Sequence, residues 1–324
     1  MRWAFFGAFI LVLLALDLGV FHRKAHKISV GEAVLWSIFW VGLGLAFNVG
    51  VYVKLGHDSG LEFLAGYLLE KSLSVDNLFV FLLIFNYFSV PAQFQHRVLF
   101  WGILGALVMR GVFILAGVAL VARFHWLLYL FGAFLIYSGV KMAFEKDEEF
   151  NPEDNPVVKW LRRYLRITPE YHGTSMFVRV DGKLYATPLL VVLAVIETTD
   201  LLFAVDSIPA VFGVTQDPFI IFTSNVMAIL GLRALYFALA GLMDIFCYLQ
   251  IGLSAVLVFI GAKMIVEHWY DLPTPIALGT IGVILTLSVV ASLVFPKKEE
   301  QPPAYTPEDV SEVPPIGADA EKVS

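Results

Sequence analysis

Two acidic motifs of the same pattern lie inside long apolar stretches of this chain. Each has an acid, five further residues, an aspartate and a small polar residue: Glu70-Lys-Ser-Leu-Ser-Val-Asp76-Asn77 and Asp200-Leu-Leu-Phe-Ala-Val-Asp206-Ser207. An ionised carboxylate in the hydrocarbon core of a bilayer costs about 2.5–3.5 kcal/mol on insertion scales. A chain that carries this motif twice is therefore predicted to use it, and the predicted use is to hold a cation.

The composition predicts the fold class, an all-α polytopic membrane helix bundle. Of the 324 residues, 59% are hydrophobic and 15% are charged, and the mean hydropathy is +0.78. A soluble domain has about 25% charged residues. Apolar runs long enough to span a bilayer recur along the chain, and the alternation typical of barrel strands is absent. The single cysteine, Cys247, excludes a disulfide within the chain and a cysteine-rich metal site.

Nine membrane spans are predicted from the apolar runs. They are 3–21, 30–53, 61–88, 98–122, 125–144, 187–212, 218–242, 245–267 and 275–295. With the N-terminus outside, the outer segments hold only Arg2, Lys54 and Arg123, whereas the inner segments hold the other loop lysines and arginines. The positive-inside rule therefore predicts an outer N-terminus and a cytoplasmic C-terminus, with the lipid bilayer as a partner.

The spans fall into segments with different predicted roles. They are an N-terminal two-helix segment (1–60), a first three-helix repeat (61–144), a cytoplasmic loop (145–186), a second three-helix repeat (187–267), a last span (268–300) and a disordered tail (301–324). Within the loop, 160–166 is either a short helix on the membrane face or part of a solvated linker, and 177–185 resembles a hairpin. The tail holds five prolines and five acids.

The repeat extends beyond the acidic motifs. Arg110 in the fourth span corresponds to Arg233 in the seventh, and Gly139-Val-Lys-Met142 corresponds to Gly261-Ala-Lys-Met264. Each copy has three spans, an odd number, so the copies enter the membrane from opposite sides. Inverted repeats with a binding site at their interface are typical of transporters. A pseudo-two-fold axis would relate two half-sites, which together are predicted to form one central cluster.

Both acids of a motif can line one cavity only if the helix is locally unwound or if the cavity wraps around it. In an unbroken helix, residues six apart differ by 600°, or about 240°, so Glu70 and Asp76 would not share a face. Ser72, Ser74 and Ser207-Ile-Pro209 are consistent with a local break. Glu197 lies three residues before Asp200 and does share its face.

A structural interpretation of these charges is that the acids pair with Arg110, Arg233 and Lys71 and hold the bundle together. The count does not balance, because five acids face three bases: the acids are Glu70, Asp76, Glu197, Asp200 and Asp206. Asp17, near the inner end of the first span, is a sixth candidate or an interfacial residue. The remaining negative charges require a cation or protons. Arg110 and Arg233 are charge partners of these acids or head-group anchors.

The donor atoms narrow the choice of ion. The predicted metal ligands are Asp17, Glu70, Asp76, Asn77, Glu197, Asp200, Asp206 and Ser207. Carboxylate, amide and hydroxyl oxygens suit Mn²⁺, Mg²⁺ or Ca²⁺, and ligand chemistry alone does not choose among them. No histidine or cysteine is interleaved with the acids, which argues against Zn²⁺ or Cu⁺ as cargo. Asn48 and Asn225 are equally consistent with ligation and with helix–helix hydrogen bonding.

The chain resembles the TerC family of integral membrane proteins, particularly its Alx-like branch. The resemblance rests on both acidic motifs, on Leu16-Asp17, on 223–236 and on the two Gly-x-Lys-Met blocks, and it covers about residues 3–295. It implies a bacterial inner-membrane protein that exports Mn²⁺, with the acidic positions Asp17, Glu70, Asp76, Glu197, Asp200 and Asp206 as its site. Thr198-Thr199 departs mildly from the expected Leu-Ser.

Two functions follow from the residues and the resemblance. The first is a transporter that exports a hard divalent cation, expected to be Mn²⁺, in exchange for protons. The second is a membrane accessory or scaffold protein that delivers metal to another complex or docks on it through the cytoplasmic loop or tail. An enzyme is not expected, because His-Glu-x-x-His and Gly-x-Gly-Asp patterns are absent. We expect no organic cofactor and no nucleic-acid partner.

Overall fold

The fold is almost entirely helical. The computed structural model describes residues 2–21, 30–144, 155–180, 182–240, 248–267, 269–270 and 272–294, without the side chains of residues 17–21. The helices are α1 (Arg2–Phe21), α2 (Val30–Leu55), α3 (His57–Tyr87), α4 (Ala92–Arg123), α5 (Leu127–Phe144), α6 (Pro156–Tyr164), α7 (Pro188–Phe212), α8 (Pro218–Ile229), α9 (Leu232–Leu239), α10 (Leu249–Val266) and α11 (Thr274–Val294). The strands are β1 (Phe177–Val180) and β2 (Lys183–Ala186). The predicted tail and residues 145–154 of the predicted loop lie outside the described residues.

Six helices are long and apolar enough to cross a bilayer, namely α2, α4, α5, α7, α10 and α11. The bent pair formed by α8 and α9 adds a seventh candidate if it is one span. α3 has 31 residues, but every 18-residue stretch of it includes both Glu70 and Lys71. In α1, the stretch whose side chains are described, Arg2–Leu16, is apolar and shorter than a full span. The structure therefore supports a polytopic helical membrane protein, and nine crossings remain a prediction.

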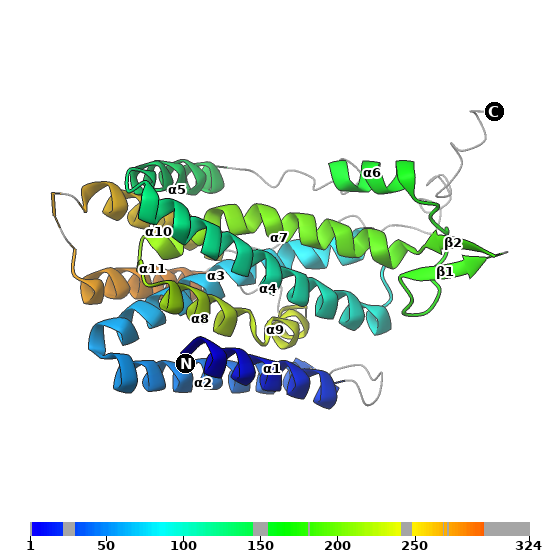
Figure 1. Cartoon of the computed structure of the whole chain (residues 1–324), viewed down its shortest axis with the longest axis horizontal. Coiled ribbons are helices and arrows are strands. Elements are labelled where there is room, and N and C mark those ends of the chain that lie inside the picture. The colour runs from blue at the N-terminus through cyan, green and yellow to red at the C-terminus, as the bar shows by residue number, and fades with distance from the viewer. Residues whose placement is uncertain are drawn as a thin grey trace.

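The long helices lie along one common direction (Figure 1). α1 and α2 form one edge of the bundle, α5 and α10 pack together at the opposite edge, and α3, α4, α7 and α8 lie between them. Of the four buried hydrophobic clusters in the described part of the chain, α3 contributes to three and α7 contributes to three. The two helices with the acidic motifs are therefore the ones around which the others pack.

α3 and α7 are continuous through the acidic motifs, so the break considered at Ser74 and Pro209 is not present. Pro209 lies in the last turn of α7, where a missing N–H removes only one bond from the helix. The Thr198 and Thr199 hydroxyls donate to carbonyls one turn earlier at 2.7 and 2.8 Å. Such bonds satisfy a buried hydroxyl without unwinding the backbone.

A break occurs instead between α8 and α9, at Leu230 and Gly231. Gly231 has φ +80° and ψ 4°, in the left-handed region that glycine enters without a steric penalty. Trp40 of α2 lies so close that a Cβ on Gly231 would overlap it. The predicted span 218–242 is therefore two helices bent by 43°.

The predicted hairpin is confirmed, because β1 pairs antiparallel with β2 and Gly182 takes φ +77° at the turn. α6 begins after Asn155, whose side-chain oxygen accepts a backbone N–H at 2.8 Å. Val158 and Leu161 are buried, and α6 packs on α7. The hairpin and α6 lie at one end of the bundle, and α6 runs nearly parallel to α7 (Figure 1). The stretch 156–164 is thus a helix packed on α7, and its place relative to the membrane face stays a prediction.

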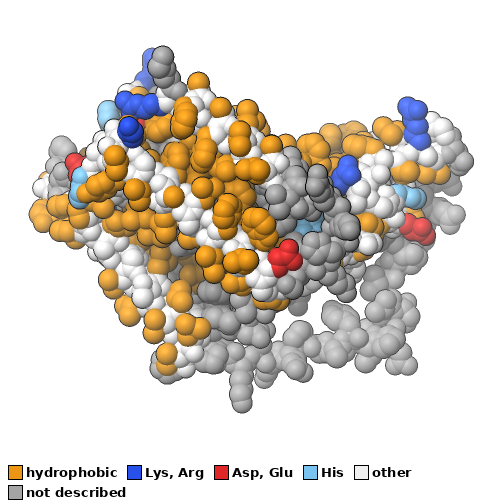
Figure 2. Space-filling model, turned by 90° about the horizontal axis from the view of Figure 1, so that it is seen from below, with side chains coloured by type: hydrophobic (Ala, Val, Ile, Leu, Met, Phe, Trp, Pro, Cys, Tyr) orange, Lys and Arg blue, Asp and Glu red, His pale blue; other side chains and the backbone are white. Residues whose placement is uncertain are grey.

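The described surface is largely apolar. Figure 2 shows hydrophobic side chains over most of one face, with the lysines and arginines toward its two ends. Leu35 of α2, Val112 of α4 and Leu287 of α11 are each more than 60% exposed. Apolar surface of this extent is rare on soluble monomers and suits contact with lipid.

The helices α5 and α10 touch backbone to backbone. A Cβ built on Gly132 would lie 2.8 Å from the carbonyl oxygen of Gly261, and one on Gly261 would lie 2.5 Å from that of Gly132. A Cβ on Gly139 would lie 2.7 Å from the carbonyl oxygen of Ser254. The two helices are therefore antiparallel and packed through glycines, as is common between membrane helices.

We predict that Gly261→Ala lowers the stability of the purified protein by about 1–3 kcal/mol, because the added methyl group would push two backbones apart. Gly279→Ala is a matched control, since it also adds a methyl group to a helix but finds nothing within 4 Å. The measurement is thermal unfolding in detergent. Equal midpoints for the two variants would show that the α5–α10 contact tolerates side chains.

Candidate functional site

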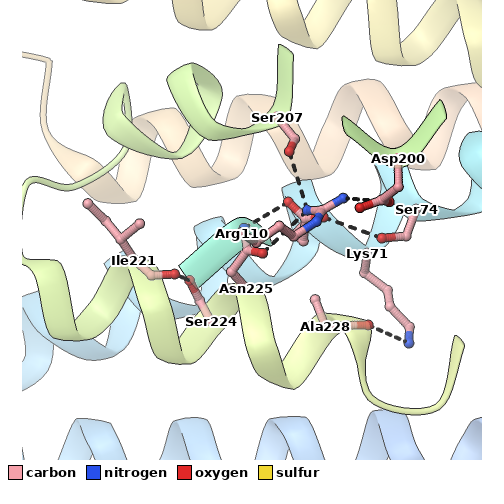
Figure 3. Close-up of polar contacts among 10 residues, drawn as sticks. Lys71, Ser74, Arg110, Asp200, Ser207, Ile221, Ser224, Asn225 and Ala228 are labelled. Carbon is pink, nitrogen blue, oxygen red and sulfur yellow. Dashed lines mark hydrogen bonds and ion pairs between the residues drawn. The ribbon is translucent and has the colours of Figure 1, made fainter. Parts of the chain in front are cut away.

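A buried guanidinium lies at the centre of the polar interior. Arg110 of α4 is 2% exposed and forms an ion pair with Glu70 of α3 through Nη1. Its Nη2 lies 3.4 Å from Oδ1 of Asp200 on α7. Nη1 also donates to Ser207 Oγ and Asn225 Oδ1, both at 3.3 Å. We call these five residues the Arg110 cluster (Figure 3).

The cluster joins four helices, because Asn225 comes from α8. Its Nδ2 donates to Oε2 of Glu70 at 2.9 Å, while its Oδ1 accepts from Arg110. Ser74, one turn after Glu70 on α3, donates to Glu70 Oε1 at 3.5 Å. Glu70 is fully buried, and both of its carboxylate oxygens are bonded. Arg110 is thus a charge partner of the acids, as one of the two sequence interpretations predicted.

The cluster has one more acid than it has bases. With both carboxylates ionised, Glu70 and Asp200 carry two negative charges and Arg110 carries one positive charge. Asp200 Oδ2 and Arg110 Nε are buried and have no hydrogen-bond partner within the described residues. Buried polar atoms normally have partners, and an unpaired buried charge is strongly destabilising. The cluster therefore has one carboxylate oxygen without a hydrogen bond and one negative charge that Arg110 does not offset.

Glu197 extends this acidic region by one helical turn. It lies three residues before Asp200, close enough for the two carboxylates to repel each other. Its carboxyl group packs on Gly105 of α4, where any side chain would overlap it. A glycine at this position therefore makes room for a carboxylate between α4 and α7.

The second acid of each motif lies outside the Arg110 cluster. Asp76 is half-buried and has no hydrogen-bond or ion-pair partner among the described residues. Asp206 accepts a hydrogen bond from Ser138 Oγ of α5 at 2.7 Å, with Lys141 of the same helix nearby. In the described part of the chain, no three acidic, histidine or cysteine side chains converge as a metal site.

The predicted single cluster of both acid pairs is therefore not formed. Continuity of the helices gives the physical reason, because a six-residue step turns Asp76 about 240° from Glu70 and moves it about 9 Å along the axis. The same step separates Asp206 from Asp200. The structure brings together the first acid of each motif and directs the second acid to other neighbours.

Of the remaining predicted site residues, some lie in the Arg110 cluster and others lie outside it. Ser207 belongs to the Arg110 cluster, whereas Asn77 is buried on α3 beside Asp76 and outside that cluster. Arg233 is buried on α9 and is not among the groups bonded to Glu70 or Asp200. Asp17 lies on α1, but its side chain is outside the described part of the chain.

Two site residues were not identified by the sequence analysis. Ser74 was considered only as a helix-breaking residue, and Ser138 was not considered at all. Serine is common in membrane helices, so neither residue gives a signal by type. Asn225 was recognised as a polar residue in an apolar span, and the structure shows that it joins Glu70 to Arg110.

Comparisons with known proteins give a consistent result. A sequence model described as "Integral membrane protein TerC family" matches residues 55–300. An uncharacterized membrane protein of Myxococcus xanthus is 53% identical over 292 residues, covering 90% of this chain and 92% of its own. A protein of Escherichia coli (strain K12) named "Putative membrane-bound redox modulator Alx" is 48% identical over 297 residues, covering 89% and 92%. The Salmonella typhi protein of the same name is 49% identical, with 89% and 92% covered. No solved structure matches.

We predict that Arg110→Met destabilises the protein by about 3–5 kcal/mol, because it leaves buried carboxylates without their base. The double variant Glu70→Gln/Arg110→Met should be more stable than Arg110→Met alone. Thermal unfolding of the four proteins of this double-mutant cycle measures the coupling. Arg123→Met, at the exposed end of the same helix, is the control and should unfold like the parent. Equal losses in the single and double variants would contradict the assigned pairing.

Proposed function

The chain belongs to the TerC family of integral membrane proteins, and on that premise we propose that it is a transporter that exports a hard divalent cation, Mn²⁺, from the cytoplasm. The observation that carries the proposal is the excess of carboxylates inside the helix bundle. Five acids, at positions 70, 76, 197, 200 and 206, are buried or half-buried in the described interior. Charges at such depth are expensive and mark ion pathways.

Arg110 gives the proposal a mechanism. In the absence of substrate, its guanidinium pairs with both Glu70 and Asp200, offsets one of their two negative charges and so lowers the cost of burying them. A divalent cation that enters the cluster would find oxygen donors from Glu70, Asp200, Ser207 and Asn225. It would have to displace the Nη atoms of Arg110. Arg110 would therefore act as an internal counter-ion that returns when the substrate leaves.

The donor atoms support a hard ion. The cluster offers carboxylate, amide and hydroxyl oxygens and no sulfur or imidazole in its described members. Such donors suit Mn²⁺, Mg²⁺ and Ca²⁺ better than soft ions. The choice of Mn²⁺ comes from the family resemblance.

The packing of α5 against α10 supports an inverted repeat. The sequence correspondence pairs Gly139 with Gly261, and the same offset pairs Gly132 with Ser254. The contact between Gly132 and Gly261 then corresponds to the contact between Ser254 and Gly139, which is also observed. Two contacts that the repeat exchanges with each other are what a two-fold axis between α5 and α10 produces. Such an axis favours alternating access to a site between the two halves.

Proton exchange follows from the acids that Arg110 does not reach. Asp76 has no ionic partner in the described structure, so burial favours either a proton or a cation on its carboxylate. Carboxylates must lose protons before they bind metal. We therefore propose that protons move inward as the metal moves outward.

The name of the Alx relatives is compatible with this function. A transporter that sets the cytoplasmic level of a redox-active metal would modulate redox state without a redox centre of its own. The second candidate is an accessory or scaffold protein that docks on another membrane complex. It is favoured by the exposed Trp160 and Tyr164 beside the exposed arginines Arg162 and Arg163 on α6.

We predict that the purified chain alone carries Mn²⁺ in proteoliposomes and that Asp76→Asn or Asp206→Asn lowers this flux by about tenfold or more, as expected when a ligand or proton carrier is lost. Asp58→Asn is the matched control, since Asp58 is an exposed acid of the same helix as Asp76. Flux at the parental rate in both variants would exclude these acids from the pathway. No flux in the parent would favour the accessory function.

We also predict that Mn²⁺ stabilises the protein against heat more than Zn²⁺ does, because the described donors are hard oxygens. Thermal-shift titration of detergent-purified protein with each chloride salt tests this prediction, with chelator-treated protein as the reference. Stabilisation by Zn²⁺ with no response to Mn²⁺ would overturn the assignment of the ion.

A further inference from the structure

The end of α8 presents backbone carbonyls that no helix continues to use. The last carbonyl oxygens of a helix lack intrahelical partners, and they carry the negative end of its dipole. The chain turns through Gly231 and bends by 43° into α9, and the carbonyls of Ala228 and Leu230 accept hydrogen bonds from a side chain of another helix. Broken helices of this kind bind cations in membrane transporters.

A positive charge already occupies this position. The Nζ atom of Lys71 donates to Ala228 O at 3.1 Å and to Leu230 O at 3.4 Å. Figure 3 shows the Lys71 side chain reaching to Ala228, away from the Arg110 cluster. Lys71 has no carboxylate within ion-pair distance among the described residues, although it follows Glu70 directly in the sequence. Within the described residues, the ammonium is therefore held by backbone carbonyl oxygens alone.

The contact between Lys71 and the end of α8 joins two features that differ between the two repeats. Where the first motif has Lys71 after its first acid, the second motif has Leu201. Where the second repeat has the broken pair α8–α9, the first has α4, which is one continuous helix of 32 residues through Arg110. Lys71 has no equivalent in the second repeat, and the α8–α9 break has no equivalent in the first. The two are bonded to each other.

We propose that the carbonyl end of α8 is a second cation-binding site on the transport path, in which the Lys71 ammonium takes the place of the transported ion in this conformation. This inference rests on the proposed function, since it names a further station for the same cation. Ala228 lies three residues after Asn225, so the site is one helical turn from the Arg110 cluster. A hard cation suits carbonyl oxygens, as it suits the carboxylates of the cluster.

The chemistry of lysine fits a removable occupant. Its ammonium is a compact charge on a flexible four-carbon stem, so it can leave the carbonyls without moving α3. When the transported ion reaches the carbonyls, Lys71 withdraws toward the carboxylates that the ion has left. The ammonium and the ion therefore exchange places, and neither group of oxygens is left without a positive charge.

The test removes the Lys71 ammonium group by mutation and then supplies an ammonium ion from solution. In the purified full chain, Lys71→Ala should unfold at a lower temperature than the parent, and ethylammonium chloride should raise its midpoint by about 2–4 °C. Choline chloride at the same ionic strength is the reference salt, because its quaternary nitrogen cannot donate a hydrogen bond. Lys71→Met keeps most of the side-chain packing and leaves no space for the amine, so it takes the place of Lys71→Ala only in the MnCl₂ measurement described below.

Lys263→Ala is the matched control variant. Lys263 also donates to a backbone carbonyl at a helix end, Gly213 O at 3.1 Å, but it lies 3.9 Å from the Glu267 carboxylate. Ethylammonium should not rescue this variant. Equal effects of ethylammonium and choline on Lys71→Ala, or equal rescue of Lys263→Ala, would overturn the proposed site.

The metal itself gives a second measurement. If Lys71 competes with the transported ion, its removal should lower the MnCl₂ concentration that gives half-maximal stabilisation by about tenfold, whereas Lys263→Ala should leave it unchanged. Mn²⁺ flux in the parent without either effect in Lys71→Ala would overturn the carbonyl site and leave the proposed function standing. Amine rescue with no flux in the parent would support the carbonyl site and count against transport.

Discussion

A single buried guanidinium organises the interior of this protein. Arg110 of α4 holds carboxylates from α3 and α7, and Asn225 of α8 connects to the same group, so four helices share one electrostatic centre. The ion pair does not cancel the charge of the cluster, because one of its two negative charges is not offset and Asp200 Oδ2 has no hydrogen-bond partner in the described structure. It fixes instead how α3 and α7 are rotated about their own axes. Every other acid in these helices takes its direction from that rotation.

That rotation is what sequence reasoning could not supply. The apolar runs predicted most helix ends to within a few residues, and the turn at Gly182 predicted the hairpin, because both features depend on local chemistry. The position of Asp206 beside Ser138 depends on which face of α7 meets α5. Neither a motif nor a spacing determines that face, since it follows from packing between distant segments. The expected cluster of both acid pairs is not formed, because α3 and α7 are continuous and turn the second acid of each motif away from the first.

The break between α8 and α9 also could not be predicted from the local sequence. Gly231 is one of many glycines in apolar spans, and nothing local distinguishes it from Gly279, which lies within an unbroken helix. The difference comes from its surroundings: Trp40 of α2 packs against Gly231, and Lys71 of α3 bonds to the carbonyls beside it. Identification of the break therefore required the neighbouring helices, whereas identification of the acids required only the sequence.

The charge of the Arg110 cluster has an electrical consequence. With both acids ionised, the empty cluster carries one negative charge, and one divalent ion reverses its sign to one positive charge. A carrier that alternates between these states is electrogenic, since each cycle moves two positive charges across the membrane. Outward movement against an inside-negative potential of 100 mV costs about 2.3 kcal/mol for each charge. Under the proposed export, the membrane voltage therefore opposes the movement of the metal, and each inward proton of the proposed exchange offsets one of these two charges.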